Sequence, residues 1–389
     1  MFEKSLKGKP AYWIWLAFLG VFIVIGAACY VRQYLFGLGL TGMSRDVSWG
    51  LYISQFTYLV GVAAGGLMLV LPYYIHDYKA FGRITILGEF LAIAAIIMCL
   101  LFIMVDIGQP LRAMNMILHP TPNSMLFWDM VVLLGYLSLN IICGWVILTA
   151  ERKQIPPPKW VYIFVYTSIP WAVSIHTVTA FLYAGLPGRH FWLSAIIAPR
   201  FLASAFAAGP ALVVIACLVM KRVAGFDAGK KALDKISTII MYATIINTFF
   251  VLLEFFTAYY SNVPGHIESL RYLFFGITEH GHTYNNLVPF MWTGVFLNFL
   301  SLGLFAYMKF KEGNDWILGG ACASIFIALW IDKGLGFVLG GFVPSMTGHI
   351  TEYYPTANEI GLTIGIWATG FFVMTVLYKI AVGVEHEVE

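Results

Sequence analysis

Charged residues are scarce in this chain. Asp, Glu, Lys and Arg make up 11% of its 389 residues, whereas soluble domains contain roughly 25%. Hydrophobic residues make up 60%, and the mean hydropathy is +0.81. A soluble globule must cover its surface with polar groups, and this chain has too few of them. The composition therefore excludes a soluble protein and predicts an integral membrane protein.

Strong positive charge and paired cysteines are also missing. A net charge of +3, with no basic face behind it, excludes nucleic-acid binding as a main role. No two cysteines form a CxxC pair, so the chain has no recognisable motif for an iron–sulfur cluster and no disulfide framework. The five isolated cysteines all fall in apolar runs: Cys29, Cys99, Cys143, Cys217 and Cys322.

Long apolar runs are what the chain has in abundance. A membrane-spanning helix needs about 20 mostly apolar residues, and ten such runs occur, whereas a transmembrane barrel would show short alternating segments. We therefore expect an all-α polytopic membrane protein. The predicted spans are Tyr12–Tyr30, Trp49–Tyr74, Ile84–Val105, Met125–Thr149, Trp160–Tyr183, Phe201–Met220, Ile236–Tyr260, Leu287–Met308, Trp316–Ile331 and Gly361–Ile380.

The basic residues predict how these spans are oriented. With ten spans, both termini lie on one side, and that side holds 16 of the 23 Lys and Arg residues, against 7 on the other. Short cytoplasmic loops carry the excess of positive charge. We therefore expect both termini to be cytoplasmic, in the cytoplasmic (inner) membrane.

Ionisable residues in the spans gather toward the outer side. Charged groups within a bilayer are costly, so each is a candidate functional residue. Glu89 lies near the cytoplasmic start of the third span, but the others map to the outer part of the membrane: Asp106, Asp129, His176, Glu254, Asp332 and Lys333. This distribution favours proton-handling chemistry near the outer surface.

His176 is the most informative of these residues. Bis-His haem ligation needs two intramembrane histidines on facing helices, and only His176 lies clearly within a span, so haem b is not expected. His176 shares a helical face with Thr179 and Tyr183. This cluster could hold a quinone carbonyl, because an imidazole N–H can donate to the oxygen and exchange the proton.

Two polar stripes accompany this cluster. On the fourth span Asp129, Tyr136 and Asn140 share a face that begins at the outer boundary. On the seventh span the stripe comprises Thr244, Asn247, Glu254 and Ser261.

The stripe on the seventh span, together with Asp332, predicts a proton path separate from the quinone pocket. A Glu254 clamped by an Arg or Lys would argue against that path. Polar residues also join transmembrane helices without doing chemistry, so packing remains an alternative for Asn140, Thr244 and Glu254.

Several motifs resemble one membrane-protein family. The run Asp106–Arg112 (DIGQPLR), followed by Pro120–Ser124 and Trp128-Asp129, is similar to the Asp-x-Gly-x-Pro-x-Arg signature of NrfD/polysulfide-reductase membrane subunits, although many relatives carry Arg at the position of Gln109. Further similarity lies in Ser174–Ala180, Pro187–Trp192, Ala198–Ala205, Trp330–Lys333 and Tyr354–Glu359. Within the family, the ten-span length and later motifs resemble the DsrP subgroup of sulfur-metabolising complexes.

The resemblance implies a fold and a function. It implies one membrane domain over residues 1–389, with a quinone-binding four-helix bundle at 47–185 (spans 2–5), a second bundle at 200–338 (spans 6–9), and flanking segments at 1–46 and 361–389. Menaquinone would bind in the first bundle near the periplasmic side. On this reading the catalytic residues are His176, Asp106 and Asp129, and the other binding residues are Thr179, Tyr183, Arg112 and Tyr136.

The resemblance also implies partners. Family members hold no haem or iron–sulfur cluster in this subunit, so electrons would pass to a periplasmic ferredoxin-like iron–sulfur (DsrO-like) subunit. The contact surface would include Arg112, Arg189 to Arg200, and His280 with His282. The subgroup further implies a multihaem cytochrome c, a membrane cytochrome b and cytoplasmic iron–sulfur subunits.

Two other functions stay open at this stage. A transporter or proton pump would use the polar stripe of the seventh span, although transporters typically show helices broken at the midplane. A passive anchor would only tether soluble redox subunits, and it has no need of ionisable groups in the outer leaflet.

Overall fold

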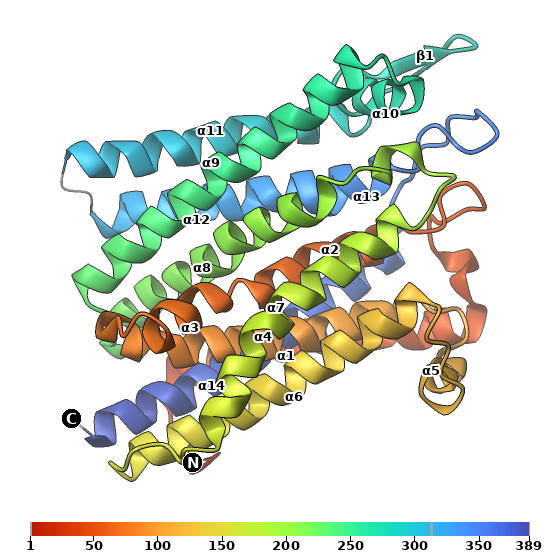
Figure 1. Ribbon diagram of the computed structural model, residues 1–389. Helices are drawn as coiled ribbons and strands as arrows, with labels where there is room; N and C mark the ends of the chain where they lie inside the picture. The colour runs from red at the N-terminus through yellow and green to blue at the C-terminus, as the bar shows by residue number, and fades with distance from the viewer. Residues whose placement is uncertain (1, 312–313, 389) are drawn as a thin grey trace.

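The computed structural model describes residues 2–311 and 314–388 (Figure 1). Within these residues, ten helical segments are long and apolar enough to cross a membrane, which confirms the predicted number of spans. Helices dominate because a backbone in hydrocarbon must satisfy its own hydrogen bonds. The spans are α1 (Pro10–Phe36), α2 with α3 (Leu51–Ala64, Leu67–Tyr74), α4 (Gly82–Asp106), α6 (Met125–Arg152), α7 (Val161–Ala184), α8 (Ile197–Ala224), α9 (Lys230–Tyr260), α11 (Val288–Phe310), α12 with the π-helix η6 and α13 (Asp315–Leu329, Trp330–Gly336, Phe337–Gly340), and α14 (Ala357–Val388).

The loops carry short elements. The helices among them are η1 (Phe2–Lys4), η2 (Leu38–Leu40), η3 (Lys79–Phe81), η4 (Pro110–Met114), α5 (Asn115–Leu118), η5 (His190–Trp192) and α10 (Pro264–Phe274). Strands β1 (Ile277–Glu279) and β2 (His282–Tyr284) pair antiparallel. Their two-residue turn, His280-Gly281, has positive φ at both positions, as a type I′ hairpin requires.

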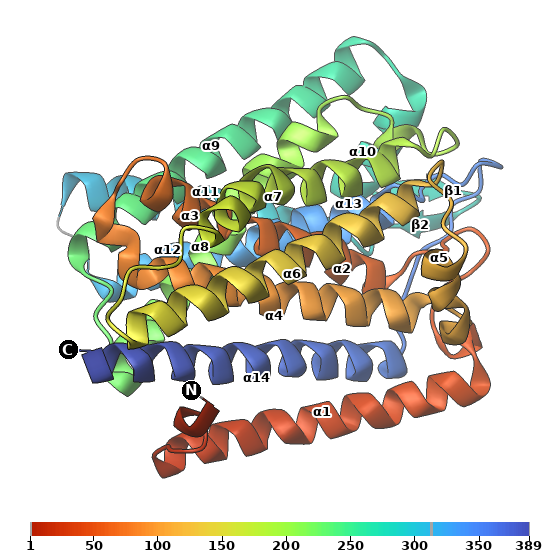
Figure 2. The same cartoon turned by 60° about the horizontal axis from the view of Figure 1, so that its bottom comes forward.

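We describe the spans as two sets along the chain. The first helix group consists of α2, α3, α4, α6 and α7, and the second helix group of α8, α9, α11, α12, η6 and α13. The groups meet where α2 and α7 pack against α8 and η6. Outside them, α1 lies along α14, and α14 lies along α4 (Figures 1 and 2).

A pair of glycines sets the closest approach between the two groups. A Cβ on Gly209 of α8 would lie 2.6 Å from the Cα of Gly65 and 2.7 Å from the carbonyl oxygen of Val62. Gly65 and Gly66 also separate α2 from α3. Small residues let transmembrane helix backbones approach in this way, and here they bring the two groups into direct backbone contact.

The ninth span differs from its prediction. We expected it to end at Ile331, with Asp332 and Lys333 at its end in the outer part of the membrane. Instead the helix continues through η6 to Gly340, so both charged residues lie inside the span. They are tolerated there because each has a polar partner on a neighbouring helix.

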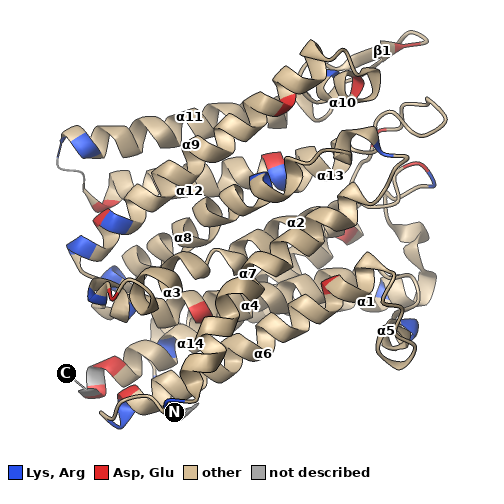
Figure 3. Cartoon of the chain, in the orientation of Figure 1, with Lys and Arg blue, Asp and Glu red and all other residues tan. Residues whose placement is uncertain are grey.

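The two ends of the molecule differ in charge. Lys and Arg gather at the end of the bundle where both termini lie (Figure 3). The opposite end carries the longer loops, with α5, α10 and the β1–β2 hairpin (Figure 1). We refer to this opposite end as the loop-rich end.

Candidate functional site

A buried lysine–histidine pair joins the two helix groups. Lys333 of η6 and His176 of α7 lie with Nζ and Nε2 2.7 Å apart, and both side chains are buried. When Lys333 is protonated it can only donate, so Nε2 then accepts and a neutral imidazole carries its proton on Nδ1. Nδ1 has no hydrogen-bond partner among the described residues. The pair therefore leaves one buried N–H donor unused.

The surroundings of the lysine–histidine pair hold it in place. A Cβ on Gly61 of α2 would lie 2.9 Å from Lys333 Nζ and 3.4 Å from His176 Cε1, so a larger residue there would require the Lys333 side chain to move. Lys333 Nζ also lies 4.2 Å from the centre of the Phe201 ring, a distance typical of a cation–π contact.

The next turn of α7 connects the pair to α6. Thr179 follows His176 by three residues and donates a hydrogen bond to Asp129 Oδ1 at 2.7 Å. One turn further, the Tyr183 hydroxyl bonds that of Thr57 on α2. The structure thus brings together four of the residues predicted for the quinone site: His176, Thr179, Tyr183 and Asp129.

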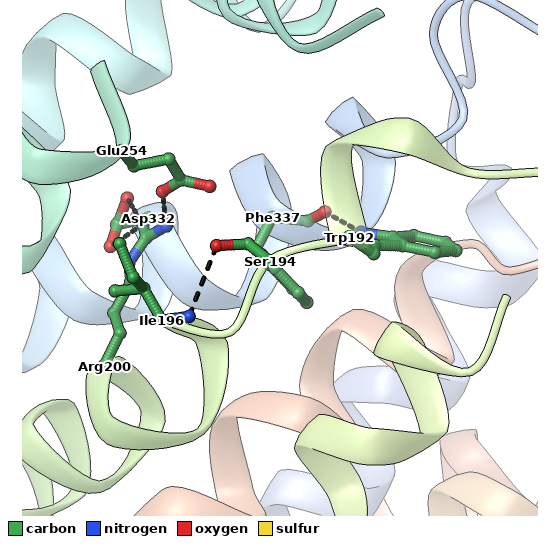
Figure 4. A network of polar contacts seen from close by, with 7 residues as sticks. All are labelled: Trp192, Ser194, Ile196, Arg200, Glu254, Asp332 and Phe337. Atoms are coloured by element: carbon green, nitrogen blue, oxygen red, sulfur yellow. Dashed lines mark hydrogen bonds and ion pairs between the residues drawn. The ribbon is translucent and has the colours of Figure 1, made fainter. Parts of the chain in front are cut away.

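Arg200 forms the centre of the second part of the site (Figure 4). From α8, its Nη1 pairs with Glu254 of α9, and its Nη2 donates to both carboxylate oxygens of Asp332, at 2.8 and 2.9 Å. Trp192, in the same view, donates to the Phe337 carbonyl at 2.9 Å and ties η5 to α13. Buried charges need such partners, because an isolated charge in an apolar interior is strongly disfavoured.

The two parts of the site adjoin at η6. Asp332 and Lys333 are neighbours in η6, and they point to different helices, α8 and α7. π-helical turns are rare and often occur at functional sites. Together Asp129, Thr179, His176, Lys333, Asp332, Arg200 and Glu254 form what we call the buried polar array, which crosses from the first helix group to the second.

The array corrects the prediction for Glu254. We expected Asn247, Glu254, Ser261 and Asp332 to form a proton path of their own, provided that no Arg or Lys clamped Glu254. Arg200 does clamp it, and Ser261 is exposed beyond the end of α9. A separate path along this stripe is therefore wrong, because Arg200 binds both Glu254 and Asp332, and Asp332 adjoins Lys333, the partner of His176.

Arg200 is the residue that sequence reasoning misplaced. We expected it in an outer loop that contacts a partner, but it is 7% exposed and lies inside α8. Its position just before the apolar run made it look like a loop residue. The sequence did hold a signal for a buried Arg200. Glu254 and Asp332 lie on other spans near the same outer end, and intramembrane charges occur in pairs.

The remaining predicted residues lie apart from the array. Asp106 ends α4, and its Oδ1 is buried without a partner among the described residues. Arg112 is exposed in η4. Tyr136 is buried on α6, where its carbonyl accepts from Asn140. Gln33, which donates to the Val105 carbonyl and accepts from Tyr52, holds the end of α4 close to α1 and α2.

The fold and the array together define a class: a polytopic helical membrane protein whose two helix groups share a buried set of ionisable side chains. Residues 39–333 match the polysulphide reductase NrfD family. The chain belongs to that family.

Known relatives extend along most of the chain. It is 27% identical to a putative membrane subunit of dimethyl sulfoxide reductase from Halobacterium salinarum, over 92% of this chain and 89% of the relative. It is 23% identical to an Hdr-like menaquinol oxidoreductase integral membrane subunit from Archaeoglobus fulgidus, over 97% and 95%. It is 26% identical to the integral membrane subunit of a menaquinone reductase from Nitratidesulfovibrio vulgaris, over 55% of each. These relatives support a quinone-interacting membrane subunit of a redox complex.

Proposed function

We propose that this protein exchanges electrons between menaquinone and an iron–sulfur partner at the loop-rich end of the bundle. The buried lysine–histidine pair carries the proposal, because it offers an unused N–H donor inside the first helix group. A quinone carbonyl needs such a donor, so the residues present fit the group. Two of the relatives are named for menaquinol or menaquinone.

The residues of the array have separate roles in this proposal. Bound menaquinone supplies two-electron redox chemistry. His176 donates from Nδ1 to the reacting oxygen, while Lys333 holds the imidazole at Nε2 and fixes its tautomer. Asp129 is held by Thr179 and accepts or returns the second proton. Because His176, Thr179 and Tyr183 are fully buried, a ring that reaches them displaces neighbouring side chains and excludes water.

The distribution of basic residues supports the orientation of the protein in this proposal. The basic end that holds both termini is assigned to the cytoplasm, so the loop-rich end is periplasmic in the inner membrane. Exposed Arg112, His280 and His282 at that end supply the surface for a ferredoxin-like, DsrO-like subunit. A cytochrome-containing complex of sulfur metabolism, as the subgroup resemblance implies, remains the predicted setting.

A proton-translocating role is the second candidate. The observation that favours it is that Asp332 and Lys333, neighbours in η6, bond ionisable side chains of both helix groups. A passive anchor has no need of these costly buried charges.

The test is His176→Ala in the assembled complex, with His119→Ala as the matched control, because His119 is an exposed loop histidine. Loss of a general acid/base should lower quinol-linked turnover by about 10²–10⁴, while the control keeps its rate. Unchanged turnover in a correctly assembled His176→Ala complex would dispose of the assignment.

A further inference from the structure

A short helical segment at the loop-rich end lies on the chain between α4 and α6. It consists of η4 and α5, which follow one another without a break over residues 110–118. Figures 1 and 2 show α5 at the margin of the bundle, near the start of α6. The end of α4 contacts η4, and η4 contacts α5. We call residues 110–118 the η4–α5 segment.

Helical geometry divides the η4–α5 segment into three faces, because residues three or four apart lie on one side of a helix. Arg112 and Asn115 form a polar face and are exposed. Ala113 and Met116 are half-buried, so their face turns toward the protein. The third face is apolar, and each of its side chains is more than half exposed: Leu111, Met114, Ile117 and Leu118.

The start of α6 marks the membrane surface beside the segment. Leu126 and Trp128 in its first turn are 53% and 44% exposed, and Ile141 further along is 48% exposed, as expected of a span that faces lipid. Trp128 donates its indole N–H to the Pro122 carbonyl at 2.8 Å, and tryptophan is typical of the membrane–water interface. Because α4 ends at Asp106, shortly before the segment, the two flanking spans place the segment at the depth of the lipid headgroups.

Lipid suits the exposed apolar face better than a protein partner does. Lipid surrounds the outer side of α6 at this depth, so it covers the apolar face without any further component. The polar face lies about a third of a turn away, so it stays in water while the apolar face enters the membrane, as in amphipathic helices at membrane interfaces. Residues 107–124 contain no Asp or Glu, so no acidic side chain there is repelled by lipid phosphates.

We propose that the η4–α5 segment lies in the headgroup region of the leaflet at the loop-rich end, with its apolar face against the acyl chains. Burial in lipid removes four large apolar side chains from water, which is favourable. The segment then anchors the end of α4, with Asp106, at the membrane surface, and Arg112 stays on the water side. This inference does not rest on quinone binding, since it needs only the insertion of the spans in a bilayer.

Spin labels on single cysteines test which face meets lipid. The full chain is placed in phosphatidylcholine nanodiscs with Cys29→Ala as background, because the other four native cysteines are buried. Nitroxide labels at Met114→Cys and Ile117→Cys report on the apolar face, and Asn115→Cys is the matched control on the polar face. Collisions of each label with oxygen, which concentrates in lipid, are compared with collisions with a water-soluble nickel chelate.

We expect oxygen collisions to exceed nickel collisions at Met114→Cys and Ile117→Cys, and the reverse at Asn115→Cys. More nickel than oxygen collisions at all three positions would overturn the inference, because the segment would then lie in water. Labels on the apolar face that lose access to nickel only when the partner subunits are bound would also overturn it, since they would show that the face docks a protein.

A second measurement needs no substitution in the segment. The wild-type chain is irradiated in nanodiscs that contain a phosphatidylcholine with a diazirine near the headgroup end of one acyl chain, and mass spectrometry identifies the labelled residues. We expect labels on the apolar face, at Leu111, Met114, Ile117 or Leu118. Labelling of Leu126 on α6 without any label in the segment would contradict the inference.

Discussion

Arg200 compensates the charges of two carboxylates in the interior of the helix bundle. It faces two carboxylates, and Lys333 lies next to one of them, so two positive and two negative side chains balance. Removing one member of a buried ion pair leaves an uncompensated charge, which costs more than the pair contributes. Each of these charged side chains therefore depends on the others for compensation of its charge.

Arg200→Met should for this reason destabilise the protein by about 3–5 kcal/mol. Thermal unfolding in detergent measures the effect. Arg271→Met is the control, because Arg271 is an exposed arginine on α10 and its loss should change little. Equal melting temperatures for the two variants would show that Arg200 is not a structural centre.

Gly61 tests the lysine–histidine pair without removing a charged group. In Gly61→Ala the new methyl would lie 2.9 Å from Lys333 Nζ, so the Lys333 side chain must move and its contact with His176 changes. We expect quinol-linked turnover to fall while folding is retained. Gly20→Ala is the control, since nothing lies within 4 Å of a Cβ there. If both variants keep the wild-type rate, the position of Lys333 is unimportant.

Among the elements, the number of spans could be predicted from sequence because the bilayer imposes about 20 apolar residues on each. The break at Gly65-Gly66 and the π-helix η6 could not be predicted, because both depend on which helix packs alongside. For the same reason only part of the candidate site could be predicted. Periodicity placed His176, Thr179 and Tyr183 on one face of α7. Only the tertiary contacts show that Lys333 bonds His176 and that Arg200 binds Glu254, because these partners lie on different helices.

The close packing of α2 against α8 gives a prediction about helix association. Gly209→Leu forces a side chain into backbone atoms of Val62 and Gly65, and overpacking of this kind costs about 1–3 kcal/mol or more. The two helix groups should separate or fail to assemble. Size-exclusion chromatography and thermal unfolding report this, with Gly303→Leu as control because the space beside Gly303 is open. A monodisperse Gly209→Leu protein of normal stability would contradict the crossing.

The whole molecule has one basic end and one loop-rich end, which sets its expected orientation in the membrane. Thr283, exposed in the hairpin, and Lys159, exposed before α7, lie at opposite ends. In spheroplasts, a membrane-impermeant maleimide should label Thr283→Cys directly and Lys159→Cys only after permeabilisation. Four of the native cysteines are buried, which keeps the background low. The reverse pattern would invert the topology.

Across the whole molecule, the bond between His176 and Lys333 is one of the contacts that join the two helix groups. The proposed function depends on these two residues acting as a unit. A double-mutant cycle on quinol-linked turnover of the assembled complex tests this most directly. Residues that act as a unit give non-additive losses. We predict that His176→Gln and Lys333→Met each lower the rate and that the double variant is no slower than the slower single variant. Losses that multiply, or a Lys333→Met complex with the wild-type rate, would contradict the account.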